Sequence, residues 1–231
     1  MAIDTLFLDA GGVLVFPNWT RVSAVLAEHG IQVDPEKLAA GEPHVRRRID
    51  EPGLIRSAPD EKRGRQYFDL VLDAAGVRPS EARDEALKQL RAYHARHNLW
   101  ESVPPDVVPA LERLRGLGLR IGIVSNANGT LCAHFGRLGL GRCVDCVIDS
   151  ADEGVEKPDP RIFARALERL GARRETTVHV GDMYHVDVVG ARAAGLHAML
   201  FDPLDLYADQ PCPRVRSLDM LAERLEDAAG R

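Results

Sequence analysis

Short apolar runs that end in a polar residue or a glycine turn alternate along this chain with longer stretches of helical periodicity. The apolar runs occupy residues 4–9, 119–126, 144–150, 177–182 and 197–202. The helical stretches between them occupy residues 105–118, 160–171 and 186–195. Strands that alternate with helices form a parallel sheet whose two faces are covered by those helices. The pattern therefore predicts an α/β fold with a Rossmann-like parallel sheet.

Residues 17–100 interrupt this alternation, because they carry helical periodicity and no convincing strand pattern. Helices are expected there at residues 20–30, 35–50, 60–76 and 80–97. A segment of this length can bury a small core of its own. We therefore predict two domains: an α/β core formed by residues 1–16 and 101–231, and an inserted all-helical domain formed by residues 17–100.

Charge and hydropathy exclude several kinds of partner. The chain has 35 acidic and 30 basic residues, a formal net charge of −5, which argues against nucleic-acid binding. No apolar run approaches the roughly 18 residues that span a membrane, and the first residues lack the basic region of a secretory signal. We expect neither nucleic-acid nor membrane partners, and no pattern in the sequence predicts an oligomeric state.

The four cysteines are Cys132, Cys143, Cys146 and Cys212. Cys143 and Cys146 form a CxxC pair, but its spacing from Cys132 is poor for a zinc site, and Cys146 lies in a strand-like run. Buried or free thiols are typical of a reducing compartment. We therefore expect free cysteines and a cytoplasmic protein.

The residues that follow the predicted strands have side chains suited to a phosphate and a cation. Asp9 and Asp182 end two of the runs, and Ser125 and Asn126 end a third. Lys157 lies in the loop after a fourth, and Asp187 comes five residues after Asp182. Ligands of open parallel sheets bind beyond the carboxyl ends of the strands. Clustered carboxylates repel one another, and Mg²⁺ with oxygen ligands would neutralise them. Ser125 and Lys157 would then bind phosphate oxygens while Asp9 attacks phosphorus.

Four motifs in this order resemble those of the haloacid dehalogenase superfamily of hydrolases. They read LFLDAGGVL, IVSN, VEKPDP and GDMYHVD. The resemblance covers nearly the whole chain, and residues 17–100 look like the type 1 helical cap of that family. It implies a Mg²⁺-dependent hydrolase, and most directly a phosphatase that forms an aspartyl-phosphate.

The resemblance also implies a role for each matched residue. Asp9 matches the nucleophile and a Mg²⁺ ligand, Ser125 the phosphate-binding hydroxyl, and Lys157 the lysine that orients and neutralises. Asp182 matches the second metal carboxylate, and Asp187 matches a further ligand or a partner that acts through water. Asn126, beside Ser125, is expected to contact the substrate.

One residue departs from the family's phosphatases. Gly11 stands where they carry an aspartate that protonates the leaving group and activates water. Gly11 can keep the main-chain carbonyl as a metal ligand but cannot transfer a proton, a contribution of typically about 10²–10⁴ in rate. His185, inside the fourth motif, is a candidate substitute donor because its pKa can lie near neutrality.

This departure leaves several readings open. The chain is a phosphatase for substrates with good leaving groups, a 2-haloacid dehalogenase, a phosphonatase-like hydrolase, or a non-catalytic metal-binding relative. A phosphonatase-like hydrolase needs a lysine that forms a Schiff base, and Lys37 and Lys62 are the candidates. Arg47, in the run Arg46–Arg48, either binds a second anionic group of the substrate or belongs to a solvated helix face. We expect the partner to be a small-molecule phosphate ester.

Overall fold

The computed structural model describes residues 3–51 and 60–229. The chain divides into two compact units. Unit 1 combines Met1–Phe16 with Val103–Arg231, and unit 2 is Pro17–Ser102. The division predicted from the sequence, at 16/17 and 100/101, differs from this one by two residues at the second junction. No helix in the described part of the chain is both long enough and apolar enough to cross a membrane.

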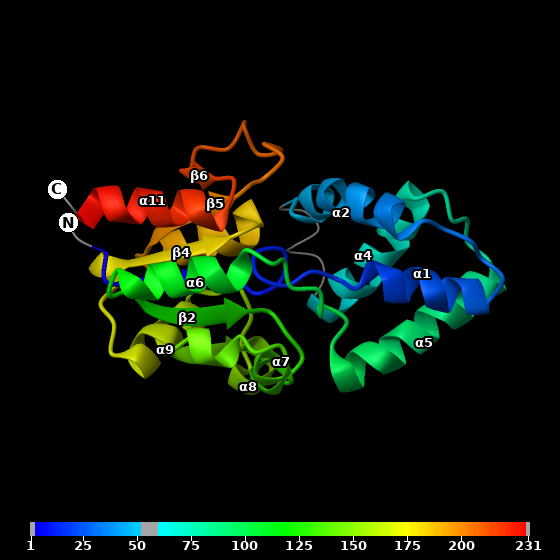
Figure 1. Cartoon of the computed structure of the whole chain (residues 1–231), viewed down its shortest axis with the longest axis horizontal. Coiled ribbons are helices and arrows are strands. Elements are labelled where there is room, and N and C mark those ends of the chain that lie inside the picture. The colour runs from blue at the N-terminus through cyan, green and yellow to red at the C-terminus, as the bar shows by residue number, and fades with distance from the viewer. Residues whose placement is uncertain (1–2, 52–59, 230–231) are drawn as a thin grey trace. The chain divides into compact units, whose positions relative to one another are not determined.

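Unit 1 is built on a six-stranded parallel sheet with the order β3-β2-β1-β4-β5-β6. Figure 1 labels β2, β4, β5 and β6 of this sheet. Its strands are β1 (Thr5–Leu8), β2 (Arg120–Ser125), β3 (Cys146–Asp149), β4 (Thr177–Gly181), β5 (His197–Phe201) and β6 (Arg214–Val215). Leu8 of β1 pairs in register with Ile123 of β2 and with Val180 of β4. The three adjacent strands therefore end together at one edge of the sheet.

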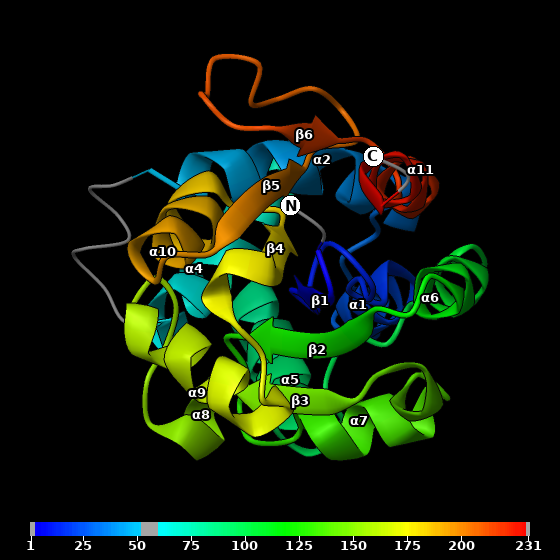
Figure 2. The same ribbon diagram turned by 90° about the vertical axis from the view of Figure 1, so that its left-hand side faces the viewer.

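Helices cover both faces of this sheet, with α6 and α11 on one face and α9 and α10 on the other (Figure 2). They are α6 (Val107–Gly116), α9 (Pro160–Leu170), α10 (Val189–Ala193) and α11 (Leu218–Ala229). Shorter pieces of the unit are α7 (Leu131–Arg137), α8 (Ser150–Glu153), η1 (Gly141–Cys143), η2 (Arg174–Thr176) and the π-helical η3 (Tyr184–Val188). This arrangement confirms the predicted α/β fold.

The sequence around α9 explains where this helix begins and ends. The Asp159 side chain accepts a hydrogen bond from the Arg161 amide, and Pro160 occupies the first turn, where its missing N–H is not needed. Gly171 ends the helix in the left-handed region at φ 57°, which glycine adopts without steric cost. The buried face of α9 carries Ile162 and Phe163, which pack on the sheet.

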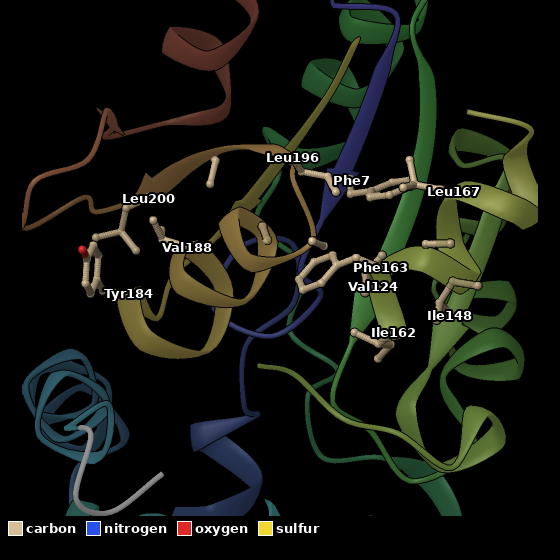
Figure 3. Close-up of a cluster of buried hydrophobic side chains, with 14 of the residues drawn as sticks. Phe7, Val124, Ile148, Ile162, Phe163, Leu167, Tyr184, Val188, Leu196 and Leu200 are labelled. Carbon is tan, nitrogen blue, oxygen red and sulfur yellow. The ribbon is translucent and has the colours of Figure 1, made fainter. Parts of the chain in front are cut away.

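These helices and strands enclose the apolar core shown in Figure 3. Phe7 and Val124 from the strands meet Phe163 and Leu167 from α9 there, and all four are at most 7% exposed. Gly122 permits this close packing, because a Cβ on it would lie 3.0 Å from Phe7 Cδ1 and 3.0 Å from Leu170 Cδ1. The core thus holds the strands in register behind their carboxyl ends.

The named secondary-structure elements in the described residues of unit 2 are all helices. Its helices are α1 (Trp19–Glu28), α2 (Pro35–Ile49), α4 (Asp60–Ala74) and α5 (Glu81–His97). Asp34 and Ser80 begin α2 and α5 by accepting hydrogen bonds from the Glu36 and Arg83 amides. An aromatic cluster joins the helices, with ring centroids 5.1 to 6.5 Å apart, and consists of Trp19, Tyr67, Phe68 and Trp100.

The two ends of unit 2 are tied to each other. Asn18 donates from Nδ2 to Glu101 Oε1 over 2.9 Å, and its main-chain N donates to the Leu99 carbonyl over 2.9 Å. Arg21 Nε also donates to Glu101 Oε1 over 2.7 Å, and the Tyr93 hydroxyl donates to Glu101 Oε2 over 2.9 Å. Glu101 therefore joins the segment before α1 to the segment after α5.

Several elements of unit 1 differ from the sequence prediction, which does not include the helices α7 and α11. The strand β6 is two residues long, too short to leave an apolar run that could be recognised. The helix expected at 186–195 begins earlier, as the π-helical η3 from Tyr184, and continues as α10 to Ala193. The difference arises because Asp187 accepts a hydrogen bond from the Met183 amide and Gly190 packs closely against Pro158, neither of which periodicity records.

Candidate active site

The site lies at the edge where β2, β1 and β4 end. The Asp9 amide donates to the Val180 carbonyl over 2.9 Å, which continues the β1–β4 pairing to the first residue beyond β1. Ser125 ends β2, and Asp182 directly follows β4; both are at most 6% exposed. After Asp9 the chain turns sharply at Gly12, with φ 75°, and the Val15 amide returns to the Ala10 carbonyl over 3.0 Å. Adjacent strand ends thus bring side chains distant in sequence to one edge.

Lys157 is buried and shares its ammonium between two carboxylates. Its Nζ lies 2.9 Å from Asp9 Oδ1 and 2.6 Å from Asp187 Oδ1, and its side chain is 1% exposed. Burial alone would lower the pKa of Lys157, but attraction to Asp187 and Asp9 outweighs it and raises the pKa above its ordinary value. Lys157 therefore carries a fixed positive charge against Asp9.

Asp187 is the other buried partner of Lys157. Burial would raise the pKa of its carboxyl, but the Lys157 charge and the hydrogen bond from His179 hold that pKa well below its usual range. Its Oδ2 accepts from the Met183 amide over 3.0 Å. Asp187 is thus an ionised group that protein donors hold through both oxygens.

His179 is a site residue that the sequence analysis missed. It lies in the middle of β4, is fully buried, and its Nε2 is 2.9 Å from Asp187 Oδ1. Burial lowers the pKa of His179 below its ordinary value, and the hydrogen bond to Asp187 opposes that shift only in part. The signal that could have found it is a histidine between valines in the run TVHVGD.

Asn126 binds Lys157 through the main chain rather than through the ammonium. Its Nδ2 donates to the Lys157 carbonyl over 3.0 Å, and its Oδ1 accepts from the Lys157 amide over 2.7 Å. These contacts hold the main chain of Lys157, and the predicted contact of Asn126 with the substrate stays a prediction. They also attach the loop that carries Lys157 to the end of β2.

The loop after Asn126 is in turn attached to the end of β3. Asp149 Oδ2 accepts from the Gly129 amide over 2.9 Å and from the Leu131 amide over 3.2 Å. Ser150 Oγ accepts from the Ala127 amide over 3.0 Å. The segment that follows Ser125 is therefore held by hydrogen bonds from the neighbouring strand end.

Gly181 is required for the position of Asp187. A Cβ built on Gly181 would lie 2.5 Å from Asp187 Cβ and 2.5 Å from Asp187 Oδ1, closer than any real contact. Gly190 plays a similar part behind the Lys157 loop, since its Cβ would lie 2.9 Å from Pro158 Cα. Because Gly181 has no Cβ, Asp187 can approach the end of β4. Because Gly190 has no Cβ, the loop that carries Lys157 can approach α10.

The carboxylates of Asp9, Asp182 and Asp187 form a candidate cation site. Each offers an oxygen atom, and these atoms lie within 4.8 Å of one another. Oxygen donors of this charge and spacing suit a hard divalent cation such as Mg²⁺. Three carboxylates against the single ammonium of Lys157 leave net negative charge, which a cation would neutralise. The residues present therefore fit Mg²⁺.

The remaining predicted site residues lie in different parts of the chain. Gly11 follows the strand end beside Asp9 and forms a bridge with Val15. Arg47 is half-buried in α2 of unit 2. Lys37 is exposed in the same helix, and the side chain of Lys62 lies outside the described residues. The four cysteines are free, and none of them joins the candidate cation group among the described residues.

Comparison with known proteins gives a family match and several relatives. The model of a family described as haloacid dehalogenase-like hydrolase matches residues 3–195. A glyceraldehyde 3-phosphate phosphatase from Methanopyrus kandleri is 36% identical over 132 residues, which are 57% of this chain and 56% of that protein. The human haloacid dehalogenase-like hydrolase domain-containing protein 3 is 31% identical over 204 residues, 85% of this chain and 81% of that protein. The chain thus matches just over half the length of the first relative.

A solved structure resembles the chain over almost its whole length. The 2-haloacid dehalogenase from Pseudomonas syringae superposes with a TM-score of 0.61 at 26% sequence identity, over 98% of this chain and 100% of that chain. The similarity supports the α/β fold described above.

Proposed function

Because the chain belongs to the haloacid dehalogenase-like hydrolase family, we propose that it is a Mg²⁺-dependent phosphatase that acts through Asp9 on a small phosphorylated metabolite. Family membership makes the chain a hydrolase. The observation that supports a phosphatase that acts through Asp9 is the pair of contacts made by the Asp9 carboxylate. This carboxylate pairs with Lys157 at 2.9 Å and also belongs to the three-carboxylate group. A carboxylate held between a fixed ammonium and a cation site is suited to attack an anionic phosphoryl group.

The proposed reaction has two displacements. An Asp9 carboxylate oxygen attacks phosphorus, and the bond from phosphorus to the ester oxygen breaks, so that this oxygen leaves with the electron pair. A water then attacks phosphorus of the aspartyl-phosphate, which releases phosphate and restores Asp9. Lys157 balances the added charge, and the Ser125 hydroxyl donates to a phosphate oxygen. A bound Mg²⁺ would supply further charge neutralisation at the same oxygens.

The site favours leaving groups of low basicity. Lys157 is a poor proton donor, because Asp187 and Asp9 raise its pKa above an already high ordinary value. Gly11 offers no side chain for proton transfer. His185 packs edge-on against Tyr184, with ring centroids 5.0 Å apart, and its role as donor stays a prediction. We therefore propose substrates whose leaving oxygen departs without a strong acid, such as acyl, enol or aryl phosphates.

The other predicted roles complete the proposal. Asp182 and Asp187, together with the Gly11 carbonyl, would hold Mg²⁺ with Asp9, and Arg47 would bind a second anionic group of the substrate. Unit 2 would act as the cap of the family. The glyceraldehyde 3-phosphate phosphatase among the relatives supports a small phosphorylated substrate. Free cysteines fit a cytoplasmic enzyme.

A second candidate is a 2-haloacid dehalogenase. The similarity to the Pseudomonas syringae enzyme favours it, and so does Gly11, since a halide leaves without a proton. In that reaction Asp9 attacks the carbon that bears the halogen, the halide leaves with the bonding pair, and water hydrolyses the resulting ester. Asp9 and Lys157 would serve both reactions, whereas the three-carboxylate group favours the phosphatase.

The test measures release of nitrophenolate from p-nitrophenyl phosphate with and without Mg²⁺, in the wild type and in Asp9→Asn. We expect Mg²⁺-dependent release that Asp9→Asn abolishes and that the exposed control Asp209→Asn retains. Chloride release from 2-chloropropionate without phosphatase activity would replace the proposal by the dehalogenase. Neither activity would identify a non-catalytic relative.

A further inference from the structure

His179 is a polar side chain in an otherwise apolar place. It pairs in register with Phe7 of β1 and Ala198 of β5, and its ring packs edge-on against Phe163 with centroids 4.9 Å apart. Its Nδ1 is buried and has no hydrogen-bond partner among the described residues. A buried polar atom without a partner costs free energy, so the fold alone would favour an apolar side chain here. The polar contact of the ring with Asp187 therefore indicates a role for His179 beyond packing.

The contacts of the ring determine which nitrogen carries the hydrogen. Nε2 lies 2.9 Å from the ionised Asp187 Oδ1, so it must donate to that oxygen. Nδ1 has no hydrogen-bond partner among the described residues. The geometry therefore places a hydrogen on Nε2, directed at Asp187.

The hydrogen bond from His179 occupies an acceptor position of the Asp187 carboxylate. Each carboxylate oxygen can accept about two hydrogen bonds. Oδ1 receives Lys157 Nζ at 2.6 Å and His179 Nε2 at 2.9 Å, so its capacity is used. Oδ2 receives the Met183 amide at 3.0 Å and keeps one acceptor position. That position is where Asp187 can meet a cation or a water.

We propose that His179 is a positioning residue for the hydrolytic site, which acts by fixing the rotation of the Asp187 carboxylate through its Nε2–H. Oδ1 then faces Lys157, which it holds at Asp9, and only Oδ2 remains for the cation. Without the His179 donor, only Lys157 and the Met183 amide hold the carboxylate among the contacts described above, and its plane is less restricted in rotation about the Cβ–Cγ bond. The inference rests on the proposed function of Asp9 and of the carboxylate group.

The test compares His179→Leu, His179→Gln and His179→Asn with the wild type in the full chain. Gln can place its amide N–H where His Nε2 donates, Leu offers no donor, and Asn is too short to reach. His134→Leu is the matched control, because it removes another buried histidine, whose ring contacts Arg137 in α7. Three quantities are measured: the Mg²⁺ dissociation constant by calorimetry, kcat and KM for p-nitrophenyl phosphate, and the melting temperature.

We expect His179→Leu to weaken Mg²⁺ binding and to lower kcat, by about 10- to 100-fold in one or both, as for other groups that orient metal ligands. His179→Gln recovers most of the loss and His179→Asn does not, whereas His134→Leu keeps the wild-type values. Long-range ¹H–¹⁵N spectra of the wild type show the hydrogen on Nε2. If His179→Leu fails to fold, the comparison of Gln with Asn decides, since both are polar and buried.

Two results would overturn the role of His179 while leaving the proposed phosphatase activity intact. One is wild-type Mg²⁺ affinity and wild-type kcat in His179→Leu. The other is the same Mg²⁺ affinity and kcat in His179→Gln as in His179→Asn. A hydrogen on Nδ1 would also overturn it. A wild type that neither binds Mg²⁺ nor turns over would instead overturn the proposed function, and this inference with it.

Discussion

The Asn126 side chain binds both main-chain groups of Lys157, donating to its carbonyl over 3.0 Å and accepting from its amide over 2.7 Å. Asn126 directly follows β2, whereas Lys157 lies 31 residues further along the chain. The main chain of Lys157 is thus fixed at one strand end while its ammonium reaches Asp9 and Asp187. A side chain next to the predicted phosphate-binding serine therefore sets the position of the lysine.

Replacing Asn126 should impair the reaction more than it impairs folding. Asn126→Ala removes two hydrogen bonds worth about 0.5–1.5 kcal/mol each, and Lys157 then loses its alignment with Asp9. We expect kcat for p-nitrophenyl phosphate to fall by roughly 10-fold. Asn128→Ala, an exposed residue in the same loop, is the control and should retain activity. Wild-type kcat in Asn126→Ala would refute the positioning role.

Adding a methyl group at Gly181 should displace Asp187. The new Cβ would lie 2.5 Å from Asp187 Oδ1, so either the carboxylate or the strand must move. We expect Gly181→Ala to cost about 1–3 kcal/mol of unfolding free energy, as in other overpacked sites, and to lower kcat. Denaturant unfolding and turnover would measure the two effects.

Gly136→Ala is the matched control for that substitution. Gly136 lies inside α7 and nothing lies within 4 Å of a Cβ placed there. Alanine in a helix interior is favoured over glycine by roughly 0.5–1 kcal/mol, so this variant should be more stable than the wild type with unchanged turnover. If Gly181→Ala also gained stability and kept the wild-type kcat, the close packing of Asp187 against Gly181 would affect neither folding nor turnover.

Glu101 should make the stability of unit 2 depend on pH. Burial would raise the pKa of Glu101, but hydrogen bonds from Arg21, Tyr93 and Asn18 outweigh it and lower the pKa below the ordinary value of 4.5. The unfolded chain therefore takes up a proton at a higher pH than the folded chain does. The stabilisation is present above pH 4.5 and is lost as the pH falls through the lowered pKa of the folded state.

Denaturant unfolding of the full chain from pH 7 to pH 3 measures this effect. Glu101→Gln, with a neutral side chain, should lose about 1.5–3 kcal/mol at pH 7, because hydrogen bonds to an ionised acceptor are lost. The difference from the wild type should shrink below pH 4.5. The exposed Glu81→Gln is the control, and a constant difference at all pH values would contradict the assignment.

Mg²⁺ should stabilise the folded chain through the carboxylate group. A ligand that binds only the folded state adds about 2.7 kcal/mol at a concentration of 100 times its dissociation constant. We expect Mg²⁺ to raise the melting temperature of the wild type and not that of Asp182→Asn. Without Mg²⁺, Asp182→Asn should melt no lower than the wild type, since one of three repelling carboxylates is gone. An equal shift in both proteins would exclude Asp182 as a ligand.

The sequence predicts those parts of the site that local patterns determine. Asp9 and Ser125 stand out because each ends an apolar run, and all such runs end at one edge of a parallel sheet. His179 could not be predicted in its role, because its partner Asp187 reaches it only where the chain after β4 packs back against Gly181. The Asn126 contacts likewise depend on where the Lys157 loop lies in space, which no local pattern records.

In the fold, too, local patterns predict some elements, whereas contacts between distant parts of the chain determine others. Apolar periodicity predicts the five longer strands and the helix α9, which has its own N-cap and a terminal glycine. It misses the two-residue β6, whose position depends on pairing with β5. It also misplaces the start of the helix after β4, since hydrogen bonds made by Asp187 shape η3.

In the proposed reaction Asp9 carries the phosphoryl group, which rapid quenching can detect. The wild type is mixed with p-nitrophenyl phosphate and Mg²⁺, quenched in acid within the first turnover, digested and analysed by mass spectrometry. We expect one added phosphoryl group on the peptide that contains Asp9, and none in Asp9→Asn. Full turnover by the wild type with that peptide unmodified at every time would contradict it.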